Sequence, residues 1–215
     1  MTPKAVIFDC DGVLVDSEPL TDAIIAANLT RHGLPMSEDR VHTLFIGGTI
    51  EGLGQQARDM GARLSDTWIN DIYAEIFARL AKGTPLIEGV SELLDRLDAA
   101  RIPYAVGSNG SRRKMEVTLG QHPGVYARLR NHLYSRHDVG APKPDPALYL
   151  HAARQLGHDP ADCVVIEDSA TGCRAAARAG IRCYGFAPSG VGEQLAAEGA
   201  VIFRKMRDLP GLFGL

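Results

Sequence analysis

Hydrophobic and polar positions along this chain alternate between short apolar runs and stretches of helical spacing. Apolar runs of three to five residues, several of them rich in β-branched side chains, are typical of strands buried on both faces of a parallel sheet. They predict strands at 5–8, 104–107, 132–134, 163–166, 182–186 and 200–202. Helical spacing between the later runs predicts helices at 91–100, 112–119, 146–156, 170–179 and 191–198. We therefore expect an α/β fold, a Rossmann-like doubly wound parallel sheet with right-handed crossovers and helices on both faces.

The segment 17–86 shows helical spacing without a convincing strand. A first helix after Asp16 ends at a break over 32–35, and a second begins at Ser37 or Glu38. Two more are expected at 50–60 and 65–81. The predicted inward residues are Leu20, Ala23, Ile24, Ala27 and Asn28 in the first helix and Ile69, Ile72, Tyr73, Ile76, Phe77 and Leu80 in the fourth. The expected domains are an α/β core, 1–16 and 87–215, and an inserted cap of four helices, 17–86.

The composition of the chain argues against nucleic acid and membranes as binding partners. The 215 residues include 23 Lys and Arg and 26 Asp and Glu, so the net charge is −3 and no basic field attracts nucleic acid or an anionic membrane. No apolar stretch is long enough to span a bilayer, and no signal-like segment precedes the first strand. The four cysteines form no C-x-x-C pair and predict buried free thiols. We expect a cytoplasmic protein with a small-molecule partner, a monomer or else a dimer.

The first chemical signal lies where the strand 5–8 ends. Asp9 and Asp11 follow it, and residues two apart on an extended chain point the same way, so their carboxylates should converge. Like charges held close must share a proton or bind a cation, and oxygen ligands favour a hard ion such as Mg²⁺. Gly12 lets the chain turn sharply after them. Taken alone, an ordinary acidic turn after a strand is an equal alternative.

Two further polar segments can supply groups for a phosphate. Ser108, with Asn109 beside it, follows the strand 104–107, where a hydroxyl and backbone N–H groups can hold an anion. A serine that caps the next helix is the alternative. Lys143 stands between two prolines, which fix the backbone that aims its ammonium group. The alternative is a solvated lysine in a proline-rich turn.

A second acidic pair, Glu167 and Asp168, follows the strand 163–166. Asp168 or Ser169 also suits the N-cap of a helix. Four carboxylates at two strand ends would repel strongly unless Mg²⁺ and Lys143 offset them. Phosphoryl transfer uses such an arrangement, because metal and lysine stabilise charge on the phosphate oxygens while a carboxylate attacks.

The segments F-D-C-D-G-V-L-V-D-S-E, S-N-G, K-P-D-P and E-D-S, in this order, resemble the haloacid dehalogenase superfamily of Mg²⁺-dependent phosphotransferases over the whole chain. The resemblance implies that Asp9 is the nucleophile, which forms an aspartyl-phosphate, and that Asp11 is the general acid and base. Ser108 and Asn109 would hold the transferring phosphoryl group, and Lys143 would bridge nucleophile and phosphate.

The same resemblance implies a set of metal ligands. Asp168 would bind Mg²⁺ together with Asp9 and the backbone carbonyl of Asp11, and Glu167 would be a closer or water-mediated helper. A carboxylate nucleophile divides ester hydrolysis into two easier displacements, so the chemistry of these residues agrees with the resemblance.

Within that superfamily the chain resembles the subgroup of β-phosphoglucomutases and sugar-phosphate phosphatases. Mutases of this subgroup carry a histidine soon after the first motif and cations in the cap loop. Here the first histidine is His32, and the stretch 46–50, where Gly48 and Thr49 are expected to contact the substrate, has no cation. Without a cap cation that binds a phosphorylated intermediate, hydrolysis by water should be faster than transfer of the phosphoryl group back to the sugar. We therefore expect hydrolysis of sugar or sugar-acid phosphates, with a phosphosugar mutase as the alternative.

The stretch S-N-G-S-R-R-K-M also resembles phosphatases that act on 6-phosphogluconate. Arg112, Arg113 and Lys114 would then read a substrate carboxylate, although a solvated helix face accounts for most of that run. A dehalogenase would not need Asp11 and the second acidic pair, and a phosphonate hydrolase would need a cap lysine closer than Lys82. A non-enzymatic binding module would not need all of these groups.

Overall fold

The computed structural model describes residues 2–45, 48–190 and 192–215. Its strands are all parallel and form one sheet in the order β3-β2-β1-β4-β5-β6. They are β1 (Ala5–Phe8), β2 (Tyr104–Ser108), β3 (Leu133–Ser135), β4 (Cys163–Glu167), β5 (Arg182–Phe186) and β6 (Val201–Phe203). The order reverses direction at β1, as in a doubly wound sheet, and the predicted fold class is confirmed.

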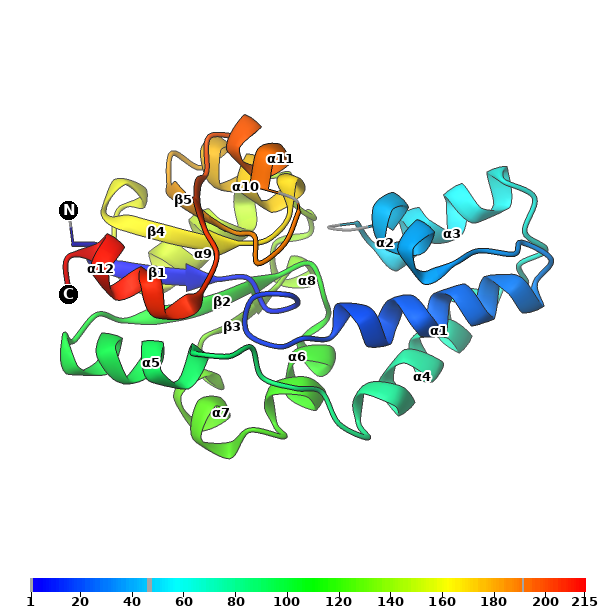
Figure 1. Ribbon diagram of the computed structural model, residues 1–215, viewed down its shortest axis with the longest axis horizontal. Coiled ribbons are helices and arrows are strands. Elements are labelled where there is room, and N and C mark those ends of the chain that lie inside the picture. The colour runs from blue at the N-terminus through cyan, green and yellow to red at the C-terminus, as the bar shows by residue number, and fades with distance from the viewer. Residues whose placement is uncertain (1, 46–47, 191) are drawn as a thin grey trace.

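Helices cover both faces of the sheet (Figure 1). One face packs against α5 (Val90–Ala99), α6 (Arg112–Leu119), α7 (Pro123–Leu129) and α12 (Leu209–Phe213), the other against α9 (Ala147–Gln155), α10 (Ala170–Arg178) and α11 (Gly192–Ala197). Short helices complete the fold: α8 (Arg136–Val139), η1 (Pro160–Asp162) and η2 (Met206–Asp208). Alternation along β1 explains the two layers, because Val6 and Phe8 enter one hydrophobic cluster and Ala5 and Ile7 enter the other.

The helices described between β1 and α5 stand apart from the sheet in Figure 1. They are α1 (Glu18–Arg31), α2 (Glu38–Phe45), α3 (Ile50–Asp59) and α4 (Trp68–Leu80), and we call them the cap helices. Their buried side chains form a separate hydrophobic cluster that includes Leu29, Trp68 and Ile72. Inside it, Trp68 Nε1 donates a 2.7 Å hydrogen bond to Asn28 Oδ1, so the buried indole N–H is satisfied.

Two chain segments connect the cap helices to the sheet, and they run side by side. The Asp16 N–H donates to the Pro85 carbonyl at 2.9 Å, and the Ile87 N–H donates to the Leu14 carbonyl at 3.0 Å. The two segments also pair antiparallel at Val15. The cap helices are therefore attached through a hydrogen-bonded, two-segment connection.

The inward face predicted for α1 is correct in part, because Asn28 is buried and Leu20 and Ile24 pack against the hydrophobic cluster of the cap helices. Ala27 is exposed there, and Leu20, Ala23 and Ile24 are only partly buried. The helix packs against both α2 and α4, and its apolar residues are spread around its axis, so spacing alone identified only part of the buried face. Its buried residues are Ile25, Ala26, Asn28 and Leu29. In α4 the predicted stripe is correct at Ile72, Ile76 and Leu80.

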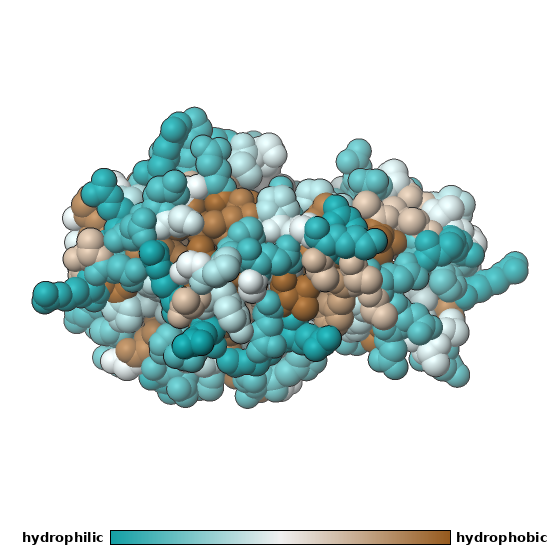
Figure 2. All heavy atoms as spheres, turned by 90° about the horizontal axis from the view of Figure 1, so that it is seen from below, coloured by the Kyte–Doolittle hydropathy of each residue, from teal (hydrophilic) through white to brown (hydrophobic). Residues whose placement is uncertain are grey.

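The surface carries no large apolar patch on the face shown in Figure 2, where hydrophilic side chains surround small separate hydrophobic ones. Large exposed apolar side chains are few among the described residues: Leu44, Met60, Val201, Leu212 and Leu215. No described helix combines the length and the hydrophobicity needed to cross a membrane. All four cysteines are buried and free, as expected.

Candidate active site

Neighbouring strands end at one edge of the sheet and bring the predicted residues together. β1 lies between β2 and β4, and its last residue, Phe8, pairs with Val106 and Ile166, so the three strands reach this edge at nearly the same level. The residues of the predicted motifs and of the predicted cap contact line one cavity there: Asp9, Asp11, Gly48, Thr49, Ser108, Asn109, Lys143, Glu167 and Asp168. The individual roles of these residues stay predictions.

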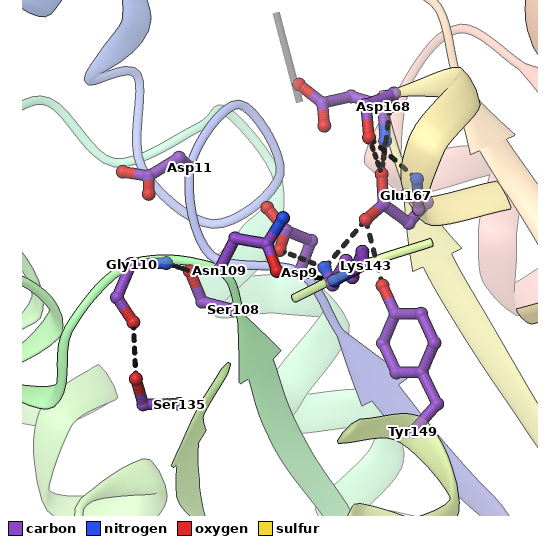
Figure 3. Close-up of polar contacts among 12 residues, drawn as sticks. Asp9, Asp11, Ser108, Asn109, Gly110, Ser135, Lys143, Tyr149, Glu167 and Asp168 are labelled. Atoms are coloured by element: carbon purple, nitrogen blue, oxygen red, sulfur yellow. Dashed lines mark hydrogen bonds and ion pairs between the residues drawn. The ribbon is translucent and has the colours of Figure 1, made fainter. Parts of the chain in front are cut away.

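Lys143 lies between two carboxylates at the base of this cavity (Figure 3). Its Nζ is 2.5 Å from Asp9 Oδ1 and 2.7 Å from Glu167 Oε1, and it sits 4.7 Å from the centre of the Tyr149 ring. Burial would lower the pKa of Lys143, but the two carboxylates outweigh burial and raise that pKa above its ordinary value. The ammonium group therefore stays charged near neutral pH and offsets negative charge at Asp9.

Glu167 is a fully hydrogen-bonded partner for that lysine. Its Oε1 also accepts a 2.8 Å bond from the Tyr149 hydroxyl, and its Oε2 accepts bonds of 2.8–2.9 Å from the N–H groups of Asp168 and Ser169 and from Ser169 Oγ. Burial would raise the pKa of Glu167, but Lys143 and these bonds together lower it. Direct metal contact would displace one of these donors, so the geometry favours a role for Glu167 in holding Lys143.

Two glycines make room for the acidic pair. A Cβ at Gly172, in α10, would lie 1.7 Å from Glu167 Oε1, and a Cβ at Gly12 would lie 1.8 Å from Asp168 Oδ2. Gly12 also has a φ of 73°, in the left-handed region that other residues rarely adopt. The close approach of the backbone to both carboxylates therefore depends on the absence of a side chain at these positions.

The loop after β2 is fixed by its own polar groups. Ser108 Oγ accepts a 3.0 Å bond from the Gly110 N–H, and Ser135 Oγ donates a 2.7 Å bond to the Gly110 carbonyl. Asn109 Oδ1 accepts a 2.8 Å bond from the Lys143 N–H, which ties this loop to the one that carries the lysine. Ser111, not Ser108, caps α6 by accepting from the Lys114 N–H. The helix-cap alternative for Ser108 is therefore excluded, and its hydroxyl faces the cavity.

Asp11 lies at the side of the cavity with its carboxylate turned away from Asp9 in Figure 3. Ser17 Oγ donates a 2.5 Å hydrogen bond to Asp11 Oδ1, and Lys114 Nζ is 2.9 Å from Asp11 Oδ2. Burial would raise the pKa of Asp11, but Lys114 and then Ser17 outweigh it, and the pKa is lowered. Asp11 is thus a carboxylate with both oxygens engaged.

The charge balance of the cavity fits a divalent cation. Burial and neighbouring carboxylates raise the pKa of Asp9 to about 7 in spite of Lys143. Burial, and after it Glu18, raises the pKa of Asp168 well above its ordinary value. Across the described ranges of the chain, no donor bonds the Asp168 carboxylate. Buried, mutually repelling carboxylates of this kind are suitable ligands for Mg²⁺.

The number of such ligands also suits Mg²⁺. No three His, Cys, Asp or Glu side chains form a metal-binding group within the described residues. Mg²⁺ commonly uses one or two carboxylates and completes its octahedron with water and substrate phosphate, so a site with two carboxylates, Asp9 and Asp168, is sufficient.

The cap helices close the cavity from the opposite side. Apolar side chains there include Ile25, Leu53 and Ile76. The polar part includes Asp22 and His42, whose Oδ2 and Nδ1 atoms are 3.0 Å apart. Of the cap residues that the structure describes along this cavity, none is Lys or Arg. The leaving group of a substrate would therefore meet a mixed apolar and hydroxyl-binding wall.

The predicted cap loop is only partly described. Gly48 and Thr49 line the cavity, and Thr49 Oγ1 caps α3 by accepting from the Gly52 N–H at 3.1 Å. Ile46 and Gly47, which belong to the same predicted stretch, lie outside the described residues.

Several residues at the site were missed in the sequence. The contact of Lys114 with Asp11 was not foreseen, because the run Arg112–Lys114 was expected either to read a substrate carboxylate or, for the most part, to form a solvated helix face. Of this run Lys114 alone lines the cavity, whereas Arg112 bonds the carbonyl of Leu133 and Arg113 is exposed. His42 reaches the cavity while His32 bonds the Asn28 carbonyl. Helical spacing after Lys143 could have identified Tyr149, whereas nothing local identifies His42, because its position depends on how α2 packs against α1.

The chain is similar to known hydrolases and phosphatases. A family model described as haloacid dehalogenase-like hydrolase matches residues 3–180. The chain is 29% identical to 6-phosphogluconate phosphatase of Escherichia coli K12, over 98% of this chain and 94% of that protein. It is 32% identical to a phosphorylated carbohydrates phosphatase of Thermotoga maritima, over 96% of each. The crystal structure of a putative β-phosphoglucomutase from Thermotoga maritima superposes with a TM-score of 0.77 at 29% identity, over 98% of each chain.

Proposed function

Because the chain belongs to the haloacid dehalogenase-like hydrolases and is a phosphoric monoester hydrolase, we propose that it hydrolyses small sugar and sugar-acid phosphates in two steps on Asp9. The observation that carries this proposal is the state of Asp9 itself. One carboxylate oxygen is held by Lys143, and the other, Oδ2, accepts no hydrogen bond from any described residue and belongs to a side chain that lines the cavity. A fixed carboxylate with one oxygen available is suited to nucleophilic attack.

In the first step, Asp9 Oδ2 forms a bond to phosphorus as the bond from phosphorus to the ester oxygen breaks. Asp11, a carboxylate in the free protein, would take up a proton when the substrate binds and give it to the departing oxygen. In the second step, water attacks the aspartyl-phosphate and gives a proton to Asp11, and Asp9 is released as a carboxylate together with inorganic phosphate. Ser108, Asn109 and Lys143 would hold the phosphoryl oxygens through both steps.

Asp9 and Asp168 would hold Mg²⁺, with the backbone carbonyl of Asp11 as a third oxygen. When bound, Mg²⁺ supplies positive charge to the phosphate oxygens and to the otherwise repelling carboxylates. Glu167 contributes by holding Lys143 and the start of α10 in place.

The substrate class rests on the relatives and on the cap wall. One relative is named for 6-phosphogluconate and another for phosphorylated carbohydrates. The wall formed by the cap helices combines apolar side chains with Asp22 and His42, groups that can bind the hydroxyls of a sugar.

We further propose that residues 17–86 act as a lid on a core formed by 1–16 and 87–215. The paired connection at Val15 would be the hinge. On the core side, Arg136 of α8 contacts Glu51 of α3 at 2.7 Å and joins lid to core away from that hinge. Closure would exclude bulk water during phosphoryl transfer. The scattered exposed apolar side chains support a monomer, and the buried free thiols support a cytoplasmic location.

Hydrolysis is proposed over mutase activity because no Lys or Arg of the described cap wall lines the cavity to bind a second phosphate, and His42 is paired with Asp22. The test is phosphate release from a panel of sugar phosphates, sugar-acid phosphates and nucleotides with Mg²⁺, with Asp9→Asn as the inactive control. β-Glucose 1-phosphate is included, and glucose 6-phosphate is measured beside phosphate. Formation of glucose 6-phosphate faster than phosphate would favour the mutase, and chloride release from a 2-chloro acid without phosphatase activity would favour a dehalogenase.

A further inference from the structure

Lys114 occupies a position that the proposed reaction does not yet use. It lies in the first turn of α6, and its Nζ is 2.9 Å from Asp11 Oδ2. The side chain is largely buried and lines the cavity. Gly110 lies beside its path, since a Cβ there would be 3.4 Å from Lys114 Cδ and 3.5 Å from Asp11 Oδ2. Gly110 therefore borders the contact between Lys114 and Asp11 at van der Waals distance.

The two oxygens of Asp11 are held from opposite sides. Ser17 stands directly before α1, in the segment that leads into the cap helices, whereas Lys114 belongs to a core helix that packs on the sheet. Lys143, the other lysine along the described cavity wall, is already bonded to Asp9 and Glu167. Of the two lysines along the described cavity wall, Lys114 is therefore the one that pairs with Asp11, and it lies on a helix of the core.

We infer that Lys114 is a positioning residue for Asp11, and this inference rests on the proposed function. Asp11 must reach the ester oxygen to protonate it as the P–O bond breaks, and must then accept a proton from water as the aspartyl-phosphate is hydrolysed. Both transfers need its carboxyl group within hydrogen-bond reach of the reacting oxygen. Lys114 sets the place from which Asp11 acts, because it anchors one oxygen to the rigid core while the Ser17 contact belongs to the connection to the cap helices. The contact that the structure shows for Lys114 Nζ is with Asp11.

This placement distinguishes Lys114 from a residue that binds substrate. Loss of a substrate contact raises KM, whereas loss of a group that positions Asp11 lowers kcat and leaves KM nearly unchanged. The effect of replacing Lys114 should also depend on Asp11, because a positioning residue no longer affects the rate once the group that it positions has been removed.

The experiment is a double-mutant cycle on Lys114→Met and Asp11→Asn, with Arg113→Met as the matched control on the exposed side of α6. Activity is measured on 6-phosphogluconate and on p-nitrophenyl phosphate in saturating Mg²⁺. Lys114→Met should lower kcat on 6-phosphogluconate roughly 10- to 100-fold, with KM within roughly 3-fold of wild type. In the Asp11→Asn background it should cause no further loss, and Arg113→Met should match wild type.

The aryl ester separates the two steps. Its leaving group needs no proton, so Lys114→Met should keep the initial burst of nitrophenolate while the steady rate falls. Lys114→Gln, which keeps a donor without the charge, is measured in parallel in case Lys114→Met does not fold. Additive losses in the cycle, or a raised KM with unchanged kcat, would assign Lys114 to substrate binding and overturn the inference. Absence of phosphate release by the wild-type protein would instead overturn the proposed function.

Discussion

For the substitution Gly172→Ala, helix propensity and the local structure predict opposite changes in the free energy of unfolding. In a helix interior, alanine is more favourable than glycine by about 1 kcal/mol, and because Gly172 lies in the first turn of α10, propensity would stabilise this helix by at most about that amount. However, the new Cβ would lie 1.7 Å from Glu167 Oε1, and the other two atoms of the carboxylate would also be within 2.5 Å of it. The whole carboxylate would have to move by roughly 1.3 Å to reach a distance of 3.0 Å.

Such a shift would break bonds that are now 2.7 Å to Lys143 Nζ and 2.8 Å to the Tyr149 hydroxyl. Hydrogen bonds to charged groups contribute about 1.5–3 kcal/mol each, so the loss of two outweighs the gain in propensity. We expect Gly172→Ala to lower the free energy of unfolding by roughly 2–5 kcal/mol, which for a chain of this length lowers Tm by roughly 4–20 °C. Phosphatase activity should fall as well, because Lys143 loses one of its two carboxylate partners.

The assay compares Gly172→Ala and a control variant, Gly124→Ala, with the wild-type protein in thermal and urea denaturation, and measures phosphate release by all three. Gly124→Ala is the matched control, because Gly124 lies in α7 with open space where the Cβ would be added. It should be as stable as wild type or up to about 1 kcal/mol more stable, with full activity. Equal behaviour of the two variants, with Gly172→Ala stable and active, would refute the assigned role of Glu167.

Three further predictions concern nucleophile, metal and cap. Asp9→Asn should retain its circular dichroism spectrum and lower phosphate release by roughly 10³-fold or more; steady turnover near wild type would show that another residue attacks. The pKa of Asp9 is about 7 in the folded protein against 3.8 when exposed, so metal-free protein should lose stability as pH rises from about 4 to 7. Mg²⁺ should therefore raise Tm more at pH 7.5 than at pH 5, and an equal rise at both would contradict this cause. Thr49→Ala should change the relative kcat/KM of different sugar phosphates and spare p-nitrophenyl phosphate; a uniform loss would place Thr49 outside substrate recognition.

The sheet and the residues at its edge were largely predictable, because the same local pattern encodes both. Each strand is a short apolar run, and Asp9, Ser108 and Glu167 stand at the ends of three of them, so the strand assignment also placed these side chains. The structure adds Ser108 to β2 and Glu167 to β4, one residue beyond the predicted ends.

What the sequence could not provide depends on packing between elements. Lys114 and Arg113 are neighbours of similar chemistry, yet only Lys114 turns into the cavity, because the orientation of α6 is set by its contacts with the sheet and α7. Likewise α7 and α12 were not predicted, since helices of seven and five residues are too short for their periodicity to be recognised. The buried face of α1 was predicted only in part for the related reason that two helices pack against it.

Trp68 gives the cap helices an optical label of their own. It is the only tryptophan of the chain, and its indole is buried in the hydrophobic cluster of the cap helices with its N–H bonded to Asn28. Emission excited at wavelengths that spare tyrosine therefore reports on that cluster, whereas far-ultraviolet ellipticity is averaged over every helix and strand. Comparing the two signals during denaturation tells whether cap and sheet unfold as one cooperative unit or in succession, without any added dye or substitution.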